Sequence, residues 1–551
     1  MDSLASQKPQ SWLSWFLRGI LIVGFLVLFA RLFETQIVKG GYFRVLSEEN
    51  RIRHIPIPAP RGRILARGGE VLAGNLDVRK AVKFKSDGAV EITDDLTGAD
   101  DDALIKDFRR TYPLGDKFSH GIGYLSEIGP EEVGRIDPAC PEKGPRPLTA
   151  LVGKTGLEGQ YQCLLEGIPG EELVEVDTAG KKIRTLGRKE PVAGRDVKTT
   201  IDYGLQVKVA EEMSGKMGAA IVTDAKGEIL AFYSEPSFDP NLFINKTDTN
   251  SAIISSLLND SGLPFFNRVI GGTFHPGSVF KLVTATAALE EKVIDRNFRY
   301  VDTGVITVGT FSYTNWYFTE YGRTEGEINL PRAIARSTDT FFYKIGEMAG
   351  PGSIAKWASA FGLNRESGVD ISGEVAGLIP TPDWKEEKIK ERWYLGDTYH
   401  MAIGQGYVAL TPIGVNSYVS AIATGKLCQP HFLLEGSKAS CDGMNLETET
   451  LRLITEGMKA ACEPGGTAYT FFDFADRHNE QEVACKTGTA EVGLDGEPHA
   501  WFVFFTPIEN PQIVATILVE EGGQGSQVAG PIARKIADYY FAATSPLNAD
   551  Q

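Results

Sequence analysis

The stretch HPGSVFKLVTATAALEE at residues 275–291 places a serine three positions before a lysine and continues with an apolar run. Almost every position after Ser278 is apolar or small except Lys281, which predicts a helix buried on all sides. A lysine in such a helix is expected to be paired, deprotonated or both, because an unpaired ammonium is costly to bury. Residues three apart share a helix face, so we expect Lys281 to reach the Ser278 hydroxyl as its base. The Ser278 N–H, unpaired at a helix start, can donate to an oxyanion.

A second copy of the pattern, GPGSIAKWASAFGL at residues 350–363, predicts a different environment. Its helix is short, and its apolar residues form one stripe of Ile354, Trp357, Ala358 and Phe361. We expect Lys356 to face water and Ser353 to be an N-cap. Because the pattern occurs twice, it does not by itself assign the nucleophile.

Two further motifs accompany the first copy. Residues 333–345, AIARSTDTFFYKI, contain Ser337-Thr338-Asp339, and residues 485–490, CKTGTA, contain Lys486-Thr487-Gly488-Thr489 on a predicted strand. The combination of S-x-x-K, S-D-N and K-T-G is the signature of penicillin-binding proteins and class A β-lactamases.

An earlier Lys154-Thr155-Gly156 precedes both other motifs, and we interpret it as a helix cap. Residues 151–170 predict one helix, in which Thr155 is the N-cap and Glu158 completes a capping box. Gly167 and Pro169 close this predicted helix.

The order and wide spacing of the three motifs give the C-terminal half its family resemblance. It resembles the transpeptidase domain of class B, high-molecular-mass penicillin-binding proteins. The S-x-D variant and GLIPTPDWK are more similar to elongation-type than to division-type members. Other similar stretches are GEILAFYSEPSFDPN (227–241), GLIPTPDWK (377–385) and AIGQGYVALTP (402–412), with RGRILARGGEVLA (61–73) and GLEGQYQCLLEG (156–167) in the pedestal domain.

This resemblance implies a peptidoglycan D,D-transpeptidase that acts in elongation and cell-shape maintenance and is a target of penicillin and other β-lactams. Ser278 would attack the D-Ala-D-Ala carbonyl of one stem peptide, and an amine of a neighbouring stem would take the acyl group. Lys281 would be the base, Ser337 would relay a proton, and the positive charge of Lys486 would lower the lysine pKa.

The resemblance also implies how substrate is held. The hydroxyls of Thr487 and Thr489 would bind its carboxylate, and the amides of Ser278 and Thr489 would form the oxyanion hole. Gly488 would leave room for substrate along the strand.

Asp339 stands where many relatives have asparagine. An ionised aspartate only accepts hydrogen bonds and adds negative charge. If its carboxylate faces Lys281 and Lys486, it favours charged lysines and opposes a neutral base. In the alternative, Asp339 points away and only caps or orients the local helix.

The predicted fold is α+β. Strand-like runs at 218–234 and in the last 70 residues enclose a mostly helical stretch, which predicts a central antiparallel sheet assembled from both ends of a domain and flanked by helices. The expected parts are a cytoplasmic tail (1–10), a transmembrane anchor (11–33), an elongated pedestal or penicillin-binding protein dimerisation domain (34–190) and a penicillin-binding transpeptidase domain (195–545).

The apolar segment at 11–33 is long enough for one membrane span. Its run at 19–30 would also suit a cleavable signal peptide, but no small-x-small cleavage site follows. We therefore expect an uncleaved, single-pass anchor in the bacterial inner membrane, with Arg18 near the cytoplasmic interface. The bulk of the chain would then be periplasmic.

The composition limits the classes of partner and cofactor that we expect. Acidic residues outnumber basic ones by 72 to 56, and no basic stripe could follow a phosphate backbone, so no nucleic acid is expected. The six cysteines form no C-x-x-C pair and are too sparse for a disulfide framework, so they do not indicate the redox compartment.

No cofactor and no metal is expected. Some elongation-type relatives carry a zinc between the first two motifs, but this chain has no histidine between 275 and 400.

Two alternative functions stay open. A D,D-carboxypeptidase would use the same residues and pass the acyl group to water. A catalytically silent β-lactam sensor or scaffold would keep only the fold. The family resemblance further implies a SEDS-type glycan polymerase as membrane partner, because no region large enough for a glycosyltransferase is evident.

Overall fold

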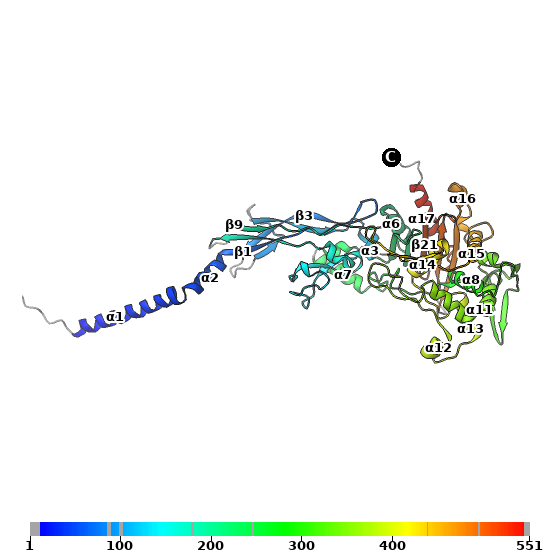
Figure 1. Ribbon diagram of the computed structural model, residues 1–551, viewed down its shortest axis with the longest axis horizontal. Coiled ribbons are helices and arrows are strands. Elements are labelled where there is room, and N and C mark those ends of the chain that lie inside the picture. Colours follow the sequence, from blue (N-terminus) through cyan, green and yellow to red (C-terminus); the bar gives the residue numbers. More distant parts are fainter. Residues whose placement is uncertain are drawn as a thin grey trace, which may run out of the picture. The chain divides into compact units, whose positions relative to one another are not determined.

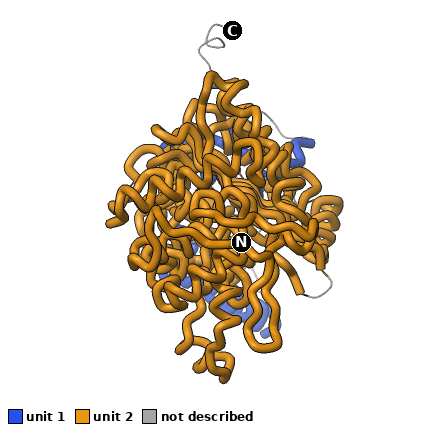
Figure 2. The backbone as a smooth tube through the Cα atoms, turned by 90° about the vertical axis from the view of Figure 1, so that its right-hand side faces the viewer, with its two compact units in different colours: residues 1–60, 77–109, 167–193 blue, residues 61–76, 110–166, 194–551 orange. Residues whose placement is uncertain are grey.

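The computed structural model describes residues 12–84, 90–97, 103–177, 181–244, 247–437, 439–493 and 496–544. The chain divides into two compact units, coloured separately in Figure 2. Unit 1 comprises residues 1–60, 77–109 and 167–193, and unit 2 comprises residues 61–76, 110–166 and 194–551. The predicted tail at 1–10 and residue 545 lie outside the described residues.

Unit 1 begins with helix α1 (Trp12–Phe33), followed by a π-helical turn η1 (Glu34–Val38) and helix α2 (Gly40–Arg51). The helical segment Trp12–Val38 has a mean hydropathy of 2.2 and no buried residue, so its length and composition fit a membrane span. The unit also holds an antiparallel sheet of β1 (Ile52–Ile57), β8 (Gly170–Val176) and β9 (Lys182–Lys189). Its small core contains Ile55, Val82, Val174 and Val176.

Strand β3 (Val71–Phe84) is shared by sequence between the units. Its second half lies in unit 1 with β4 (Val90–Thr93), and β5 (Leu104–Thr111) also pairs with it. Its first half, in unit 2, pairs with β2 (Ile64–Leu65), which pairs in turn with β10 (Val197–Lys198).

The helix predicted over 151–170 is wrong at its start. Residues Leu151–Gly153 form strand β7, paired with β6 (Leu125–Glu127), and only α4 (Gly156–Gln160) and α5 (Gln162–Leu165) are helical. Thr155 is the N-cap residue, but its side chain makes no capping bond. Glu158 is fully buried and accepts from Arg61 Nε (2.7 Å) and Arg110 Nε (2.6 Å). Two guanidinium groups bind this carboxylate more strongly than one backbone amide would, so the predicted capping box does not form.

The central sheet of unit 2 has the order β12-β11-β21-β20-β19 and is antiparallel throughout. Its strands are β11 (Gly218–Thr223), β12 (Ile229–Glu235), β19 (Ala484–Val492), β20 (Gly496–Thr506) and β21 (Ile513–Val519). The prediction of a sheet assembled from both ends of the domain is confirmed. Strand β19, which carries Lys486, is an edge strand.

Helices cover both faces of this sheet (Figure 1). Alternate residues of β20 point to opposite faces, as in any strand. Phe502 and Phe504 pack in the core that includes α6 (Tyr203–Met213) and α17 (Ala529–Thr544). Trp501 and Val503 pack in the second core, which contains the helices next to the S-x-x-K and Ser337-Thr338-Asp339 motifs.

The helical stretch between the strand groups builds most of that second core. Its longer elements are α7 (Asp248–Leu258), α8 (Lys281–Glu290), α9 (Trp316–Tyr321), α10 (Leu330–Arg336), α11 (Asp339–Ala360), α12 (Pro382–Lys388), α13 (Leu395–Ala402), α14 (Pro412–Thr424) and α15 (Thr448–Ala461). Short elements connect them: η6 (Gly277–Phe280), β13 (Tyr300–Asp302), β14 (Val305–Val308), β15 (Phe311–Thr314), β16 (Gly326–Ile328), β17 (Lys426–Cys428) and β18 (Cys441–Gly443).

The second serine–lysine copy lies in the last turns of α11. The stripe predicted for it is buried or half-buried, and Lys356 is exposed and forms an ion pair with Glu291 at 2.5 Å. The prediction that Ser353 is an N-cap is wrong. Gly350 is the residue with non-helical backbone angles, so Ser353 lies inside the turn that follows it.

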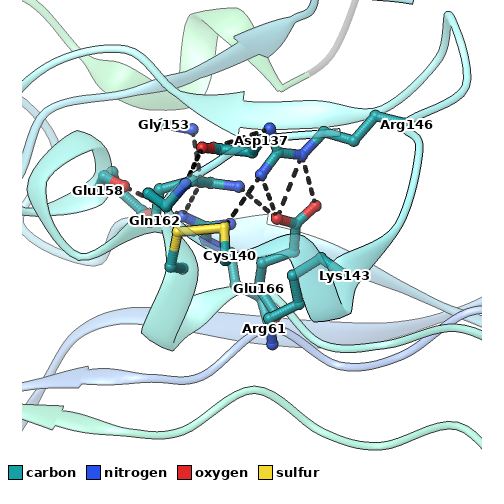
Figure 3. Close-up of a disulfide and its surroundings, with 11 residues drawn as sticks. Arg61, Asp137, Cys140, Lys143, Arg146, Gly153, Glu158, Gln162 and Glu166 are labelled. Atoms are coloured by element: carbon teal, nitrogen blue, oxygen red, sulfur yellow. Dashed lines mark hydrogen bonds and ion pairs between the residues drawn. A yellow bond between two sulfur atoms is a disulfide. The ribbon is translucent and has the colours of Figure 1, made fainter. Parts of the chain in front are cut away.

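All six cysteines form disulfides, which corrects the prediction that they are too sparse for a framework. The pairs are Cys140–Cys163, Cys428–Cys441 and Cys462–Cys485. Cys428 and Cys441 face each other across the paired strands β17 and β18, whereas each of the other two pairs joins separate elements that the sequence does not show to be neighbours. Figure 3 shows Arg146 beside the first pair, donating to Glu166 Oε2 (2.6 Å) and Asp137 Oδ2 (3.2 Å).

Candidate active site

Ser278 lies in the turn η6, directly before the buried helix α8. Gly277 has a φ of +54°, and a Cβ atom there would lie 2.6 Å from the Thr489 carbonyl oxygen. Only glycine allows both this left-handed backbone and so close an approach. The turn therefore places the half-buried Ser278 against the edge strand β19.

Lys281 is buried, as are all residues from 281 to 289, which confirms the predicted buried helix. Its Nζ donates to Asp339 Oδ1 (2.6 Å), to the Ser337 carbonyl oxygen (2.8 Å) and to Ser337 Oγ (3.1 Å). The expected direct hydrogen bond to Ser278 does not form among the described residues. The reason is that the second motif takes all three donors of the ammonium.

Ser337 links the two lysines. It caps the C-terminus of α10 with a φ of +54°, a left-handed conformation that is strained for any residue other than glycine. Its Oγ accepts from Lys281 Nζ at 3.1 Å and from Lys486 Nζ at 3.0 Å. One hydroxyl therefore connects two basic groups from different elements.

Asp339 opens helix α11 and faces Lys281. Its Oδ2 accepts from the backbone N–H of Trp316 at 3.1 Å, while its Oδ1 accepts from Lys281. The alternative that this carboxylate points away from the lysine does not hold in the structure.

The electrostatics of the two lysines differ. Burial, together with the charge of Lys281, holds the pKa of Lys486 well below its usual range. Burial also lowers the pKa of Lys281, but the adjacent Asp339 carboxylate opposes that shift. The ion pair therefore favours a proton on Lys281 in the resting site, whereas the sequence-based mechanism needs this lysine neutral.

Comparison with known proteins gives the three motifs a family context. Residues 218–538 match the family described as "Penicillin binding protein transpeptidase domain", and residues 90–199 match "Penicillin-binding Protein dimerisation domain". The chain belongs to the penicillin-binding protein transpeptidase family. The peptidoglycan D,D-transpeptidase MrdA of Haemophilus influenzae is 32% identical, and the match covers 96% of this chain and 90% of that protein.

Solved structures agree with this family. The complex between penicillin-binding protein PBP2 and MreC from Helicobacter pylori matches with a TM-score of 0.76 and 26% identity, covering 90% of this chain and 99% of that chain. A peptidoglycan synthase complex, described as coordinating polymerization and crosslinking, matches with a TM-score of 0.73 and 27% identity, over 97% of this chain and 99% of that chain.

In this penicillin-binding protein, the K-T-G strand is fixed from several sides. Thr487 is nearly buried and its hydroxyl bonds that of Thr467 at 2.9 Å, whereas Thr489 is exposed and accepts from the Gly525 N–H at 3.3 Å. A Cβ at Gly488 would lie 2.8 Å from Trp501 Cβ. The glycine is thus required for packing against its partner Trp501 on the neighbouring strand β20, a reason that the substrate-based interpretation missed.

Sequence reasoning also missed residues that position the site. Cys485, directly before Lys486, is tied to Cys462 at the end of α15. The loop that follows carries Thr467, whose N–H donates to the Ala335 carbonyl oxygen at 3.2 Å. No local pattern reveals these links, because each joins elements far apart in the chain. Cys485 at least offered a signal, since it lies directly before Lys486 of the K-T-G motif.

One group of metal-ligating residue types occurs within the described ranges, namely Asp137 with Cys140 and Cys163. Both sulfur atoms belong to the disulfide and are not free thiolates, which are the form of cysteine that binds metals. This group is therefore not a candidate metal site.

Proposed function

We propose that this protein is a serine peptidoglycan D,D-transpeptidase that cross-links stem peptides during cell-wall elongation and is acylated by β-lactams. The observation that carries this proposal is the Ser337 hydroxyl held between two buried lysines, next to the Ser278 turn. A serine hydroxyl needs a base to become a nucleophile, and this arrangement supplies one together with a proton path.

In the proposed reaction, Ser278 Oγ bonds to the penultimate D-alanine carbonyl carbon and gives its proton to the neutral form of Lys281. Ser337 passes a proton to the nitrogen of the departing D-alanine as the C–N bond breaks. The acyl group then moves to an amine of a second stem, whose proton returns through the same groups. Lys486, 3.0 Å from Ser337 Oγ, supports this transfer.

Substrate is held along the edge strand β19. The side of an edge strand that has no neighbour can pair with an extended peptide. The Thr487 and Thr489 hydroxyls bind the terminal carboxylate, and the Ser278 and Thr489 amides donate to the oxyanion. The close approach of Gly277 to the Thr489 carbonyl supports this pairing of amides, because it brings the two backbones together.

Two experiments test the function. A fluorescent penicillin followed by peptide mapping should give an adduct on Ser278; absence of any adduct would favour a silent scaffold. Incubation with paired stem peptides should give cross-linked dimer and free D-alanine. Release of D-alanine without dimer would identify a D,D-carboxypeptidase instead.

We propose a single-pass protein of the bacterial inner membrane, with the domains that follow the anchor in the periplasm. The apolar helix Trp12–Val38 and the three disulfides support this location, because disulfides persist in oxidising compartments. Deleting residues 1–35 should release soluble protein that still binds penicillin. A mature cellular form that begins after residue 30 would identify a signal peptide instead.

A SEDS-type glycan polymerase is the proposed partner. The likeness to a peptidoglycan synthase complex that coordinates polymerization and crosslinking supports this pairing. Co-purification of the full chain with such a polymerase, lost when residues 1–35 are deleted, tests it.

A further inference from the structure

Asp302 is a buried carboxylate outside all three motifs. It ends strand β13, 37 positions before Asp339, and is 2% exposed. Four donors saturate its two oxygens: Gly304 N (2.9 Å) and Thr340 Oγ1 (2.7 Å) on Oδ1, with Asn315 Nδ2 (3.2 Å) and Glu325 N (2.9 Å) on Oδ2. All four donors are uncharged, so hydrogen bonds alone hold this carboxylate in the interior.

Two of these donors lead directly to the active site. Asn315 donates to Asp302 through Nδ2, and its Oδ1 accepts from the backbone N–H of Asp339 at 3.2 Å. The next residue, Trp316, donates its N–H to Asp339 Oδ2 at 3.1 Å. Thr340, bound to the other oxygen of Asp302, directly follows Asp339 in the chain. Asp302 thus anchors residues on both sides of the Asp339 carboxylate.

We propose that Asp302 is a positioning residue that holds the Asp339 carboxylate against Lys281. It does not touch the reacting atoms and acts through Asn315 and Thr340. The inference rests on the proposed function, in which Lys281 must lose its proton to activate the serine. Its consequence is that a change at Asp302 alters the protonation of a lysine that it does not contact.

An amide cannot replace this carboxylate. Asparagine has one acceptor oxygen and an NH₂ group, so Asp302→Asn would set two N–H donors against the donors that now bind Oδ1 or Oδ2. At least one arm of the network must then open. Loosening of Asn315 or Thr340 frees Asp339 to turn away from Lys281, which removes a charge that favours the protonated form of this lysine.

The test measures penicillin acylation rates of the full chain from pH 5 to 10. Asp302→Asn should lower the pH of half-maximal acylation by about half a unit or more, the same direction as Asp339→Asn. In the Asp339→Asn background, Asp302→Asn should cause no further shift, because residues acting through one group are non-additive. Thr340→Val should shift the profile in the same direction, and Thr340→Ser, which keeps the hydroxyl, should not.

Asp370 provides a matched control. Its carboxylate also accepts from three uncharged donors, Phe432 N (2.6 Å), Leu433 N (3.0 Å) and the Tyr161 hydroxyl (2.6 Å), away from the three motifs. Asp370→Asn should leave the profile unchanged. An equal shift in this control, an unchanged profile in Asp302→Asn, or additivity with Asp339→Asn would overturn the inference.

Misfolding of a variant and failure of the proposed function can each be distinguished from failure of this inference. If Asp302→Asn does not fold, Thr340→Val decides, and an unchanged profile in that variant would refute the proposal. Failure of the wild-type protein to label at Ser278 would refute the proposed function itself rather than the role of Asp302.

Discussion

Replacing Asp339 by asparagine removes the one carboxylate bonded to the buried Lys281. At their separation of 2.6 Å, two unit charges interact by about 1.6 kcal/mol even in a dielectric of about 80. About 1.4 kcal/mol corresponds to one pKa unit, so the pKa of Lys281 should fall by at least about one unit. The burial of Lys281, with only 14% of the Asp339 side chain exposed, makes this value a lower bound, because screening by water is weaker in the interior.

In the proposed reaction the neutral Lys281 is the base, so a lower pKa of this lysine makes the base available at lower pH. The pH of half-maximal acylation by a fluorescent penicillin should therefore fall by at least about one unit, with folding confirmed by thermal unfolding. Lys385 and Asp397 form a similar buried-lysine pair, 2.7 Å apart, outside the three motifs. Asp397→Asn is the matched control and should not move the profile. A shift to higher pH in Asp339→Asn would refute the electrostatic argument, and no shift would show that this carboxylate does not control the base.

Four other variants give clear expectations. Ser278→Ala should abolish penicillin labelling, and Ser353→Ala should leave it intact; an adduct that survives the first change would place the nucleophile elsewhere. Lys281→Ala should fold and acylate at least about a hundredfold more slowly, measured by stopped-flow labelling, and a normal rate would mean that another group is the base. Replacing Cys462 and Cys485 by serine should cost about 2–5 kcal/mol in denaturant unfolding and also slow labelling. The other two disulfides are controls, and equal kinetic effects on removing them would contradict a local role next to the K-T-G strand.

The sequence alone was sufficient to predict the buried helix, the central sheet and the three motifs of the site. The buried helix after Ser278 follows from its composition, and the sheet built from 218–235 and 484–519 follows from two separate groups of strand-like runs. The three motifs, located by sequence alone, do converge around Ser337.

The remaining features depend on contacts between distant segments. Lys281 donates to the carbonyl oxygen and the hydroxyl of Ser337, and the left-handed backbone of Ser337 sets the positions of these two acceptors. No residue propensity predicts that conformation for serine. Glu158 fits a capping box by spacing, but two arginines from elsewhere in the chain take its carboxylate. Two of the disulfides, Cys140–Cys163 and Cys462–Cys485, also join separate elements, and cysteine spacing does not show which sulfur atoms meet in space.

The two glycines packed around the nucleophile bear on inhibitor resistance. Adding one methyl group at Gly277 or Gly488 would drive a carbon into the backbone of Thr489 or into Trp501. A substitution at either glycine would therefore disturb the packing of the Ser278 turn and of strand β19 against their neighbours, so these positions are poorly suited to stepwise resistance mutations. An inhibitor that gains most of its affinity from the main chain around Gly277 and Gly488 would leave few viable mutations that confer resistance.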